Sequence, residues 1–268
     1  MSGQVLVVGQ GLLGKALARQ PTAKEFRFVS HREVSNPAIL DGVDCVVNLA
    51  LDPAYWDEPY RSDIDFDLRL ASLIGNRPIH YVMASSRKVY GEGSAKPFTE
   101  DMFLCPVDTY GRNKAQTECA LLAAFDGRLT ILRISNVIGF DWQWDRRIFM
   151  GILLDSLRRQ NRIVFDVSPF ARRDFITDDA VGAVLAWAAT ARPIGMFNVG
   201  TGAALEIGKI ALWVLAAYGK GDLVVTSPCI RDEFSIDISK LTKLFGPTCS
   251  IDALKAKCTD FGRHIAHA

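Results

Sequence analysis

Residues 5–14 read Val5-Leu6-Val7-Val8-Gly9-Gln10-Gly11-Leu12-Leu13-Gly14 and decide the fold. A β-branched run, a glycine turn and a helix-forming stretch follow one another here, as at the start of a strand–turn–helix unit. Glycines in such a turn let backbone N–H groups approach a pyrophosphate, which the positive end of the helix attracts. The pattern predicts a dinucleotide site formed by Gly9, Gln10, Gly11, Leu12, Leu13 and Gly14, with an ordinary tight turn as the alternative.

Strand-like and helix-like segments alternate along the rest of the chain. Strands are expected at 26–29, 45–49, 80–83, 129–134, 163–165, 197–199 and 223–225, and helices at 60–74, 110–125, 148–159, 178–190, 206–218, 238–245 and 252–257. This alternation is typical of a parallel sheet covered on both faces. We therefore expect an α/β fold, a Rossmann-type doubly wound parallel sheet with a small interleaved C-terminal substrate lobe. The dinucleotide domain would span 1–140 and about 171–200, and the lobe about 141–170 and 201–268.

The composition excludes several classes of protein. Of the 268 residues 49% are hydrophobic and 23% are charged, which is typical of a globular chain. The net charge of +1 gives no overall field that favours nucleic acid or an anionic membrane as a partner. The longest uncharged apolar stretch, 180–191, is too short to cross a bilayer, and the N-terminus shows no secretory pattern. We expect a cytoplasmic protein.

The cysteines and histidines do not form a recognisable metal motif. The six cysteines, at positions 45, 105, 119, 229, 249 and 258, lie far apart without a CxxC pair and indicate reduced, mostly structural thiols. His264 and His267 stand near the C-terminus without a supporting ligand set, so we interpret them as frayed surface. The sequence predicts no metal centre.

The end of the second expected strand bears on the choice of cofactor. An NAD site usually carries an acidic residue there to bind the ribose 2′-OH, whereas this chain reads Ser30-His31-Arg32-Glu33. Ser30, His31 and Arg32 could hold a 2′-phosphate by charge-assisted hydrogen bonds. NADP(H) is therefore favoured and NAD is the second choice. In the alternative, Arg32 is solvated and Glu33 takes the ribose.

Tyr110 and Lys114 stand four residues apart and share one face of the expected helix. A nearby ammonium favours the phenolate, which makes tyrosine a usable acid or base around neutrality. Ser85 and Ser86 follow the strand at 80–83 and place a hydroxyl at the carboxyl edge of the sheet, where ligands bind in such folds. Tyr110, Lys114 and one of the two serines, Ser85 or Ser86, are therefore candidate catalytic groups.

An ordered set of motifs resembles the extended short-chain dehydrogenase/reductase family of nucleotide-sugar epimerases, dehydratases and reductases. The matching segments are 44–50 (DCVVNLA), 85–91 (SSRKVYG), 97–101 (PFTED), 110–114 (YGRNK), 132–139 (LRISNVIG), 173–176 (RDFI), 197–200 (FNVG) and 237–240 (DISK). They recur in family order over nearly the whole chain. One departure is the glycine turn, which is one residue shorter than the family's GxxGxxG and leaves the contacts of Gln10 open.

The resemblance implies roles for individual residues. Ser86 would hydrogen-bond the reacting sugar oxygen, Tyr110 would be the acid/base, and Lys114 would hold Tyr110 and the nicotinamide ribose. Leu49 and Ala50 would belong to the cofactor site. Residues on the substrate side would be Ser86, Arg87, Asn136, Arg173 and Arg231, with the last three at the nucleotide diphosphate. Two guanidiniums suit a doubly charged pyrophosphate, and a surface ion pair is the alternative for each.

The resemblance also narrows the reaction. Family dehydratases carry an acidic pair where this chain has Arg87 and Lys88, so dehydration is disfavoured. Reduction of a 4-keto-6-deoxy sugar nucleotide is preferred, because the predicted cofactor is NADPH. A 4-epimerase with tightly bound NAD is the first alternative. A non-catalytic dinucleotide sensor and a reductase for a non-sugar carbonyl are the others.

Two further expectations concern partners. Relatives use the helices matching 60–74 and 110–125 to form a four-helix dimer interface, to which Leu68, Leu121 and Leu122 could contribute. Trp142 and Trp144 could stack on the base or sugar, although tryptophans more often serve the core. Which nucleotide and which sugar bind is left open by the sequence.

Overall fold

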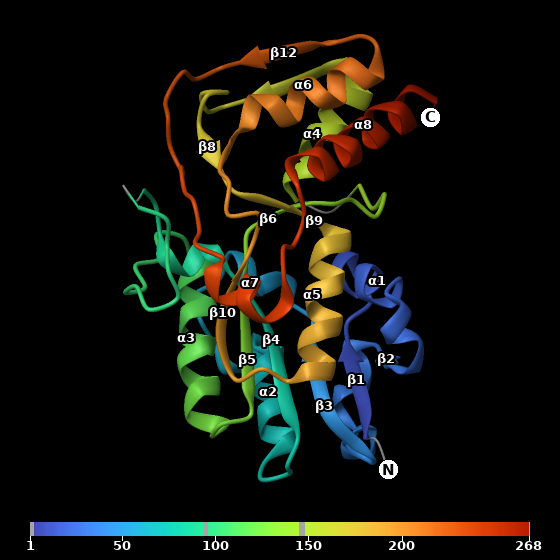
Figure 1. The fold of residues 1–268 in the computed structure, drawn as a ribbon, viewed down its shortest axis with the longest axis vertical. Helices are drawn as coiled ribbons and strands as arrows, with labels where there is room; N and C mark the ends of the chain where they lie inside the picture. Colours follow the sequence, from blue (N-terminus) through green and yellow to red (C-terminus); the bar gives the residue numbers. More distant parts are fainter. Residues whose placement is uncertain (1–2, 94–95, 145–147, 268) are drawn as a thin grey trace.

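Within residues 3–93, 96–144 and 148–267, which the computed structural model describes, a six-stranded parallel sheet forms the centre of the fold (Figure 1). The strands lie in the order β10-β5-β4-β3-β1-β2. Their bounds are β1 (Gln4–Val8), β2 (Arg27–Val29), β3 (Val43–Asn48), β4 (His80–Ser86), β5 (Leu129–Ile134) and β10 (Gly195–Val199). The predicted Rossmann-type fold is confirmed.

Helices cover both faces of the sheet because the strands are apolar on both sides. On one face Val5 and Val7 pack with α1 (Leu12–Ala18) and α5 (Asp178–Ala191). On the other face Leu6 and Val8 belong to the cluster that contains α2 (Phe66–Ile74) and α3 (Thr109–Ala124). Side chains of successive strand residues point to opposite faces, so a continuous run of apolar residues fills both layers.

The strand order of the sheet reverses at β1, which creates a topological switch point there. The strand β1 pairs with β2 on one side and with β3 on the other. The Gly9 N–H donates to the carbonyl of Val29 (3.0 Å), and the Leu49 N–H donates to that of Val8 (2.8 Å). Ligands of open α/β sheets bind at the carboxyl ends of strands at such a point. The glycine turn and residues 49–50 lie there.

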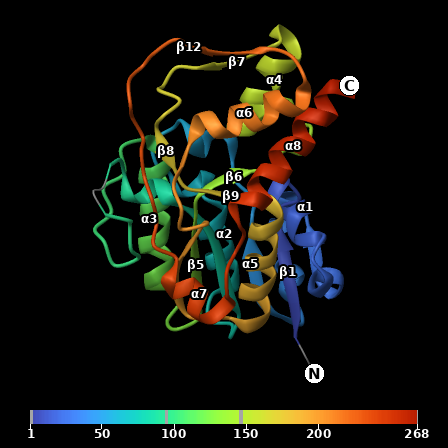
Figure 2. The same cartoon turned by 45° about the horizontal axis from the view of Figure 1, so that its top comes forward.

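A second group of elements packs around its own apolar cluster at one end of the sheet (Figures 1 and 2). It contains α4 (Phe149–Gln160), β7 (Arg162–Phe165), α6 (Ile207–Tyr218), β12 (Asp222–Val225) and α8 (Ile251–His267). The strand β7 pairs in parallel with β12. Two further short ladders lie at the junction, β6 (Asn136–Ile138) with β9 (Phe175–Thr177) and β8 (Arg172–Arg173) with β11 (Leu205–Glu206).

The helix α7 (Ser239–Phe245) returns to the main sheet. It packs against the edge strand β10, and Leu241 belongs to the apolar cluster beneath α5. The predicted division into 1–140 with 171–200, and 141–170 with 201–268, stays a prediction. Short 3₁₀ helices join the other elements: η1 (Pro21–Glu25), η2 (His31–Ser35), η3 (Pro37–Leu40), η4 (Pro53–Trp56), η5 (Ser62–Ile64) and η6 (Arg87–Tyr90).

Some predicted elements have different bounds in the structure. The helix expected at 60–74 begins only at Phe66, because the Asp65 side chain accepts from the N–H groups of Asp67 and Leu68 and caps the helix there. The helix expected at 252–257 continues to His267, since its apolar residues pack on α6. Gly262 permits this contact, because a Cβ at that position would lie 2.3 Å from the Val214 carbonyl oxygen.

Two expectations about surface residues are wrong. His264 is exposed but not frayed: it lies in α8 and stacks on Trp142, with 3.8 Å between the ring centroids. Leu121 lies on the buried face of α3 and is fully buried, so it cannot serve a dimer interface, whereas Leu122 is 49% exposed and Leu68 is half-buried. A dimer through α2 and α3 stays a prediction. Among the described residues, no helix is both long and apolar enough to span a membrane.

Candidate active site

Ser86 ends β4 at the carboxyl edge of the sheet and begins η6. Its hydroxyl accepts a hydrogen bond from the Lys88 N–H (3.3 Å), and its interaction with the phenol of Tyr110 lowers the pKa of that phenol. The neighbouring Ser85 points elsewhere, because its hydroxyl donates to the buried carboxylate of Glu118. Of the two adjacent serines, only Ser86 faces the tyrosine.

The start of α3 is held tightly against η6, and this brings Tyr110 beside Ser86. The Asp108 carboxylate accepts from the Gly111 N–H (2.7 Å) and caps the helix. A Cβ at Gly111 would lie 2.5 Å from the Lys88 carbonyl oxygen, so only glycine permits this approach. Lys88 in turn forms an ion pair with Asp108. This close contact with η6 explains why the YGRNK segment has glycine at position 111.

Lys114 lies one turn after Tyr110 on α3 and is buried at 4% exposure. Its ammonium is 3.6 Å from the Asp67 carboxylate and lies 5.3 Å from the centre of the Tyr55 ring. Burial works against the charged form of Lys114, but the neighbouring carboxylates, Asp67 first, raise the pKa of the ammonium above its ordinary value. Lys114 is a stable cation at this site.

The pKa of Tyr110 is raised above the ordinary value of a phenol. Burial is the largest cause, Lys114 and the hydrogen bond to Ser86 lower the pKa, and Asp67 and Asp108 raise it. The sequence predicted that Lys114 would favour the phenolate and make this tyrosine a usable acid or base around neutrality. Lys114 does lower the pKa of Tyr110, but burial and two carboxylates outweigh its effect.

Glycines allow this turn to pack closely against the backbone that follows β3 and against the start of α1. Gly9 has a φ of +104°, and a Cβ there would lie 2.7 Å from the Ala50 nitrogen. A Cβ at Gly14 would lie 2.3 Å from the Gly9 carbonyl oxygen. Gly11, Leu12, Leu13, Leu49 and Ala50 are half-buried around this turn, and Gln10 is exposed. The residues present fit the pyrophosphate of a dinucleotide.

The segment at the end of β2 is arranged as a short capped turn. The Ser30 hydroxyl accepts from the Arg32 N–H, and the Glu33 carboxylate accepts from the Ser30 N–H (2.7 Å). Glu33 is therefore engaged in the cap, which weakens the alternative in which it binds the ribose. The side chains of His31 and Arg32 are exposed beside the turn.

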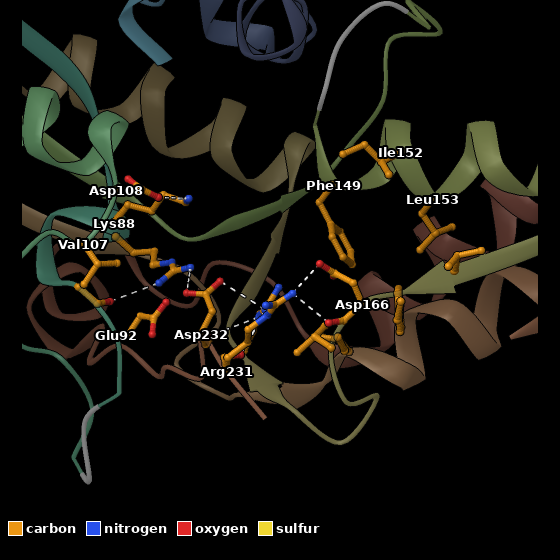
Figure 3. Close-up of a pocket in the computed structure, with 17 residues that line it drawn as sticks. Lys88, Glu92, Val107, Asp108, Phe149, Ile152, Leu153, Asp166, Arg231 and Asp232 are labelled. Carbon is orange, nitrogen blue, oxygen red and sulfur yellow. Dashed lines mark hydrogen bonds and ion pairs between the residues drawn. The ribbon is translucent and has the colours of Figure 1, made fainter. Parts of the chain in front are cut away.

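A cavity of about 450 Å³ is lined by Arg87, Lys88 and Asp108, which are close in sequence to Ser86 and Tyr110, whereas Ser86, Tyr110 and Lys114 are not among its lining residues (Figure 3). Its apolar end is formed by residues of α4, β7 and α6, including Phe149, Phe165 and Ile207. Its polar end contains Arg87, Lys88, Arg173 and Arg231 together with Glu92, Asp108, Asp166 and Asp232. The structure thus brings three of the predicted substrate residues, Arg87, Arg173 and Arg231, to one cavity. Asn136 lies in β6, half-buried, and is not among the lining residues.

The cations of this cavity are paired with carboxylates. Asp232 lies between Arg87 (2.5 Å) and Arg173 (3.5 Å), and Arg231 pairs with the exposed Asp166 (2.5 Å; Figure 3). Arg87 is buried and also stacks over the Phe234 ring, 3.8 Å from its centre. An anionic ligand would exchange these internal partners for its own charges.

The structure places the two tryptophans of the 140–147 segment away from the cavity lining. Trp142 and Trp144 pack against the apolar cluster of α4, α6 and α8, and each contacts Phe140 edge-on. Residues 145–147 lie outside the described residues. Within the residues that the structure does describe, no group of His, Cys, Asp and Glu is arranged to hold a metal ion. Cys45 and Cys258 are buried, whereas Cys105, Cys119 and Cys229 are exposed.

Two residues of the site are absent from the sequence predictions. Asp67 is a buried carboxylate on the same helical stripe as Leu70 and Ile74, and an acidic residue on such an apolar stripe is a signal that could have found it. Trp56 stacks on the ring of Tyr110, at 4.0 Å between centroids. Trp56 lies 54 residues before Tyr110, so no local sequence pattern indicates that the two residues meet.

This fold and site define a dinucleotide-binding α/β enzyme whose tyrosine, lysine and serine meet at the edge of the sheet. A family model described as the NAD dependent epimerase/dehydratase family matches residues 5–200, and the chain belongs to that family. The resemblance stated from the motifs and the prediction of an enzyme of the short-chain dehydrogenase/reductase type are confirmed.

Solved structures with the same fold cover nearly all of the chain. One is a UDP-N-acetylglucosamine 4-epimerase from Methanobrevibacter ruminantium in complex with UDP-N-acetylmuramic acid (20% identity, 100% of this chain and 99% of that one, TM-score 0.83). Another is UDP-glucose 4-epimerase from Thermus thermophilus with NAD (17%, 97% and 99%, 0.79). A third is RMD from Pseudomonas aeruginosa with NADPH (20%, 97% and 99%, 0.75).

Proposed function

We propose that the protein reduces the 4-keto group of a 6-deoxy sugar carried on a nucleoside diphosphate, with NADPH as the reductant. The observation that carries this proposal is the pairing of Lys114 with Asp67 beside Tyr110 (3.6 Å), together with the raised pKa of the Tyr110 phenol. A phenol that keeps its proton at neutral pH is a proton donor. Reduction of a ketone requires a donor at the carbonyl oxygen.

The chain's own residues account for the proton and for the orientation of the carbonyl. A reduced nicotinamide, when bound, supplies the hydride to the carbonyl carbon. Ser86 donates a hydrogen bond to the carbonyl oxygen, and Tyr110 transfers its phenolic proton to that oxygen as the alcohol forms. Tyr110 then recovers a proton from water. The balance is one ketone, one NADPH and one proton consumed for one alcohol and one NADP⁺.

The charged cavity supports a nucleotide-linked substrate. Arg173 and Arg231 offer guanidiniums for a diphosphate, and the apolar end next to Phe149 and Phe165 is suited to a base. The exposed Arg32 and the capped position of Glu33 support NADP(H) over NAD. Arg87 and Lys88 stand where the resembling dehydratases carry their acidic pair, which argues against water elimination.

A 4-epimerase is the second candidate, and it makes a different demand on Tyr110. Epimerisation begins with oxidation of the sugar hydroxyl, so the tyrosine must first act as a base in its phenolate form. The raised pKa of Tyr110 opposes that first step. Two solved structures of 4-epimerases share this fold at 17–20% identity, and the test below therefore includes epimerisation.

The test is steady oxidation of NADPH, followed by the loss of nicotinamide absorbance, with 4-keto-6-deoxy sugars on dTDP, UDP, GDP and CDP. Tyr110→Phe should remove most of the rate and leave NADPH affinity nearly unchanged. Tyr218→Phe is the matched control, because the Tyr218 hydroxyl donates to Asn161 and neither residue lines the cavity. Full activity of Tyr110→Phe would overturn the assignment.

Other outcomes separate the alternatives. Interconversion of two sugars by protein that retains NAD, without a change in absorbance, would replace reduction by epimerisation. Stabilisation by NADP without turnover of any sugar nucleotide would indicate a sensor, because a ligand that binds only the native state raises the melting temperature. Unchanged substrate affinity in Arg231→Ala would favour a non-sugar carbonyl.

A further inference from the structure

A buried carboxylate lies directly behind the lysine of the site. Asp67 is 2% exposed, and its Oδ2 is 3.6 Å from the ammonium of Lys114. Its Oδ1 accepts hydrogen bonds from the Asn48 side chain and the Tyr81 hydroxyl, both at 2.8 Å. Three elements, β3, β4 and α3, therefore hold this one side chain. Burial raises the pKa of Asp67 above its ordinary value, whereas the ammonium of Lys114 and the two donors act in the opposite direction and favour the ionised carboxylate.

A second carboxylate stands beside it. Asp65 accepts from the Asp67 N–H (2.9 Å) with Oδ1, and from the hydroxyls of Thr117 and Tyr60 with Oδ2. Like Asp67, Asp65 raises the pKa of Lys114 through its negative charge. The start of α2 thus presents two carboxylates to one ammonium.

The remaining charged groups around the pair are matched by partners of their own. Asp108, at the start of α3, forms an ion pair with Lys88. Glu118, one turn after Lys114, forms a buried ion pair with Arg133 (2.7 Å). The neighbouring phenols, Tyr55 and Tyr81, have pKa values raised by burial and are neutral. Besides burial, the charges that act on Tyr110 are therefore Lys114, which lowers the pKa of the phenol, and Asp67 followed by Asp108, which raise it.

We propose that Asp67 is a positioning residue that acts through Lys114: it offsets the charge of the ammonium, keeps Tyr110 in its phenol form and biases the site towards reduction. The direction of reaction in this inference rests on the proposed function. The effect of Asp67 on the ionisation of Tyr110 does not depend on that function. Opposite charges within about 4–6 Å favour each other's ionised form. A negative charge near a phenol opposes its ionisation to the phenolate. Removal of the Asp67 charge should therefore release the full effect of Lys114 on Tyr110.

The direct experiment follows the ionisation of Tyr110 without any substrate. The protein is labelled with tyrosine carrying ¹³C at Cζ, and the Tyr110 signal, assigned by its loss in Tyr110→Phe, is titrated with pH by NMR. In Asp67→Asn the titration midpoint should move to lower pH than in the wild type. Asp67→Ser, also neutral, should move it in the same direction, and Asp67→Glu should not.

A matched control removes a carboxylate from the same segment but away from the site. Asp63 precedes Asp67 by four residues, is exposed and pairs with Arg61. Asp63→Asn should leave the Tyr110 midpoint in place. A purely structural role for Asp67 would lower the melting temperature of its variants without moving the midpoint. A midpoint that stays constant or rises in folded Asp67→Asn and Asp67→Ser would overturn the proposal.

A second readout uses the reverse reaction, oxidation of the sugar alcohol by NADP⁺. Its kcat/KM increases with pH as Tyr110 loses its proton, and this rise should begin at lower pH in Asp67→Asn. Each unit of midpoint shift raises the phenolate fraction about tenfold at pH values well below the midpoint. Should the protein prove to be an epimerase, the NMR titration still tests Asp67, so the failure of the proposed function and the failure of this inference are distinguishable.

Discussion

The indole of Trp56 stacks face to face on the phenol ring of Tyr110, with 4.0 Å between the ring centroids and 15° between the planes. The stack is held by α3 itself, because the Asn113 side chain donates to the carbonyls of Tyr55 (2.9 Å) and Glu58 (3.0 Å) on either side of the tryptophan. The helix α3 thus carries the tyrosine, the lysine and the Asn113 side chain that holds the segment of Trp56 against the tyrosine.

Loss of this stack should slow the reaction more than it weakens binding. Aromatic pairs contribute about 0.5–1.5 kcal/mol, so Trp56→Ala should lower kcat roughly two- to tenfold through a less ordered phenol. Steady-state kinetics with NADPH provide the measurement. Trp56→Phe keeps a ring over Tyr110 and should stay close to the wild type; equal kcat for Trp56→Ala and the wild type would contradict the role of the stack.

The cofactor preference should depend on Arg32. A guanidinium that contacts the 2′-phosphate makes charge-assisted hydrogen bonds, and their loss in Arg32→Ala should weaken NADPH binding roughly ten- to hundredfold. Binding of NADH should not change, because it lacks that phosphate. Both dissociation constants can be measured by nicotinamide fluorescence. Arg263→Ala, an exposed arginine of α8, is the control, and an equal effect on both cofactors would argue against this contact.

The ion pair behind Ser85 should be important for stability. Glu118 is 1% exposed and accepts from Arg133 through Nε and Nη2, as well as from the Ser85 hydroxyl. Glu118→Gln leaves a buried guanidinium without a counter-charge, which costs about 3–5 kcal/mol of unfolding free energy. Urea denaturation measures this loss. The exposed carboxylate of Asp260 is the control, since Asp260→Asn should cost less than about 1 kcal/mol. A comparably small loss in Glu118→Gln would show that the pair is dispensable.

The pH dependence of stability should report on Asp174. Burial raises the pKa of this carboxyl to about 6, although Thr201 donates to it. The folded state then binds the proton more tightly than the unfolded chain, so between pH about 4 and about 6 the unfolding free energy falls as pH rises. Asp174→Asn should lack this fall, and its advantage over the wild type should grow through that window by up to about 3 kcal/mol. Urea midpoints measured across and above that window test it; a difference that stays constant with pH would exclude the shift.

Local sequence pattern predicted the parts of the fold that depend on neighbours along the chain. The apolar run before Gly9 forms β1 with the turn after it, and the run at 129–134 matches β5 residue for residue. Tyr110 and Lys114 share a face of α3 because a helix brings residues four apart together. Such features follow from backbone geometry and side-chain periodicity, which any short segment carries.

Tertiary packing alone decided the charge state of the site and the environment of several residues. Asp67 reaches Lys114 from 47 positions earlier, and its carboxylate, with burial, reverses the expected shift in the pKa of Tyr110. Leu121 is core and His264 is a stacking partner because of elements distant in sequence. Periodicity states which residues share a face, but a pKa and a buried surface depend on what that face meets, and only the folded chain brings those partners into place.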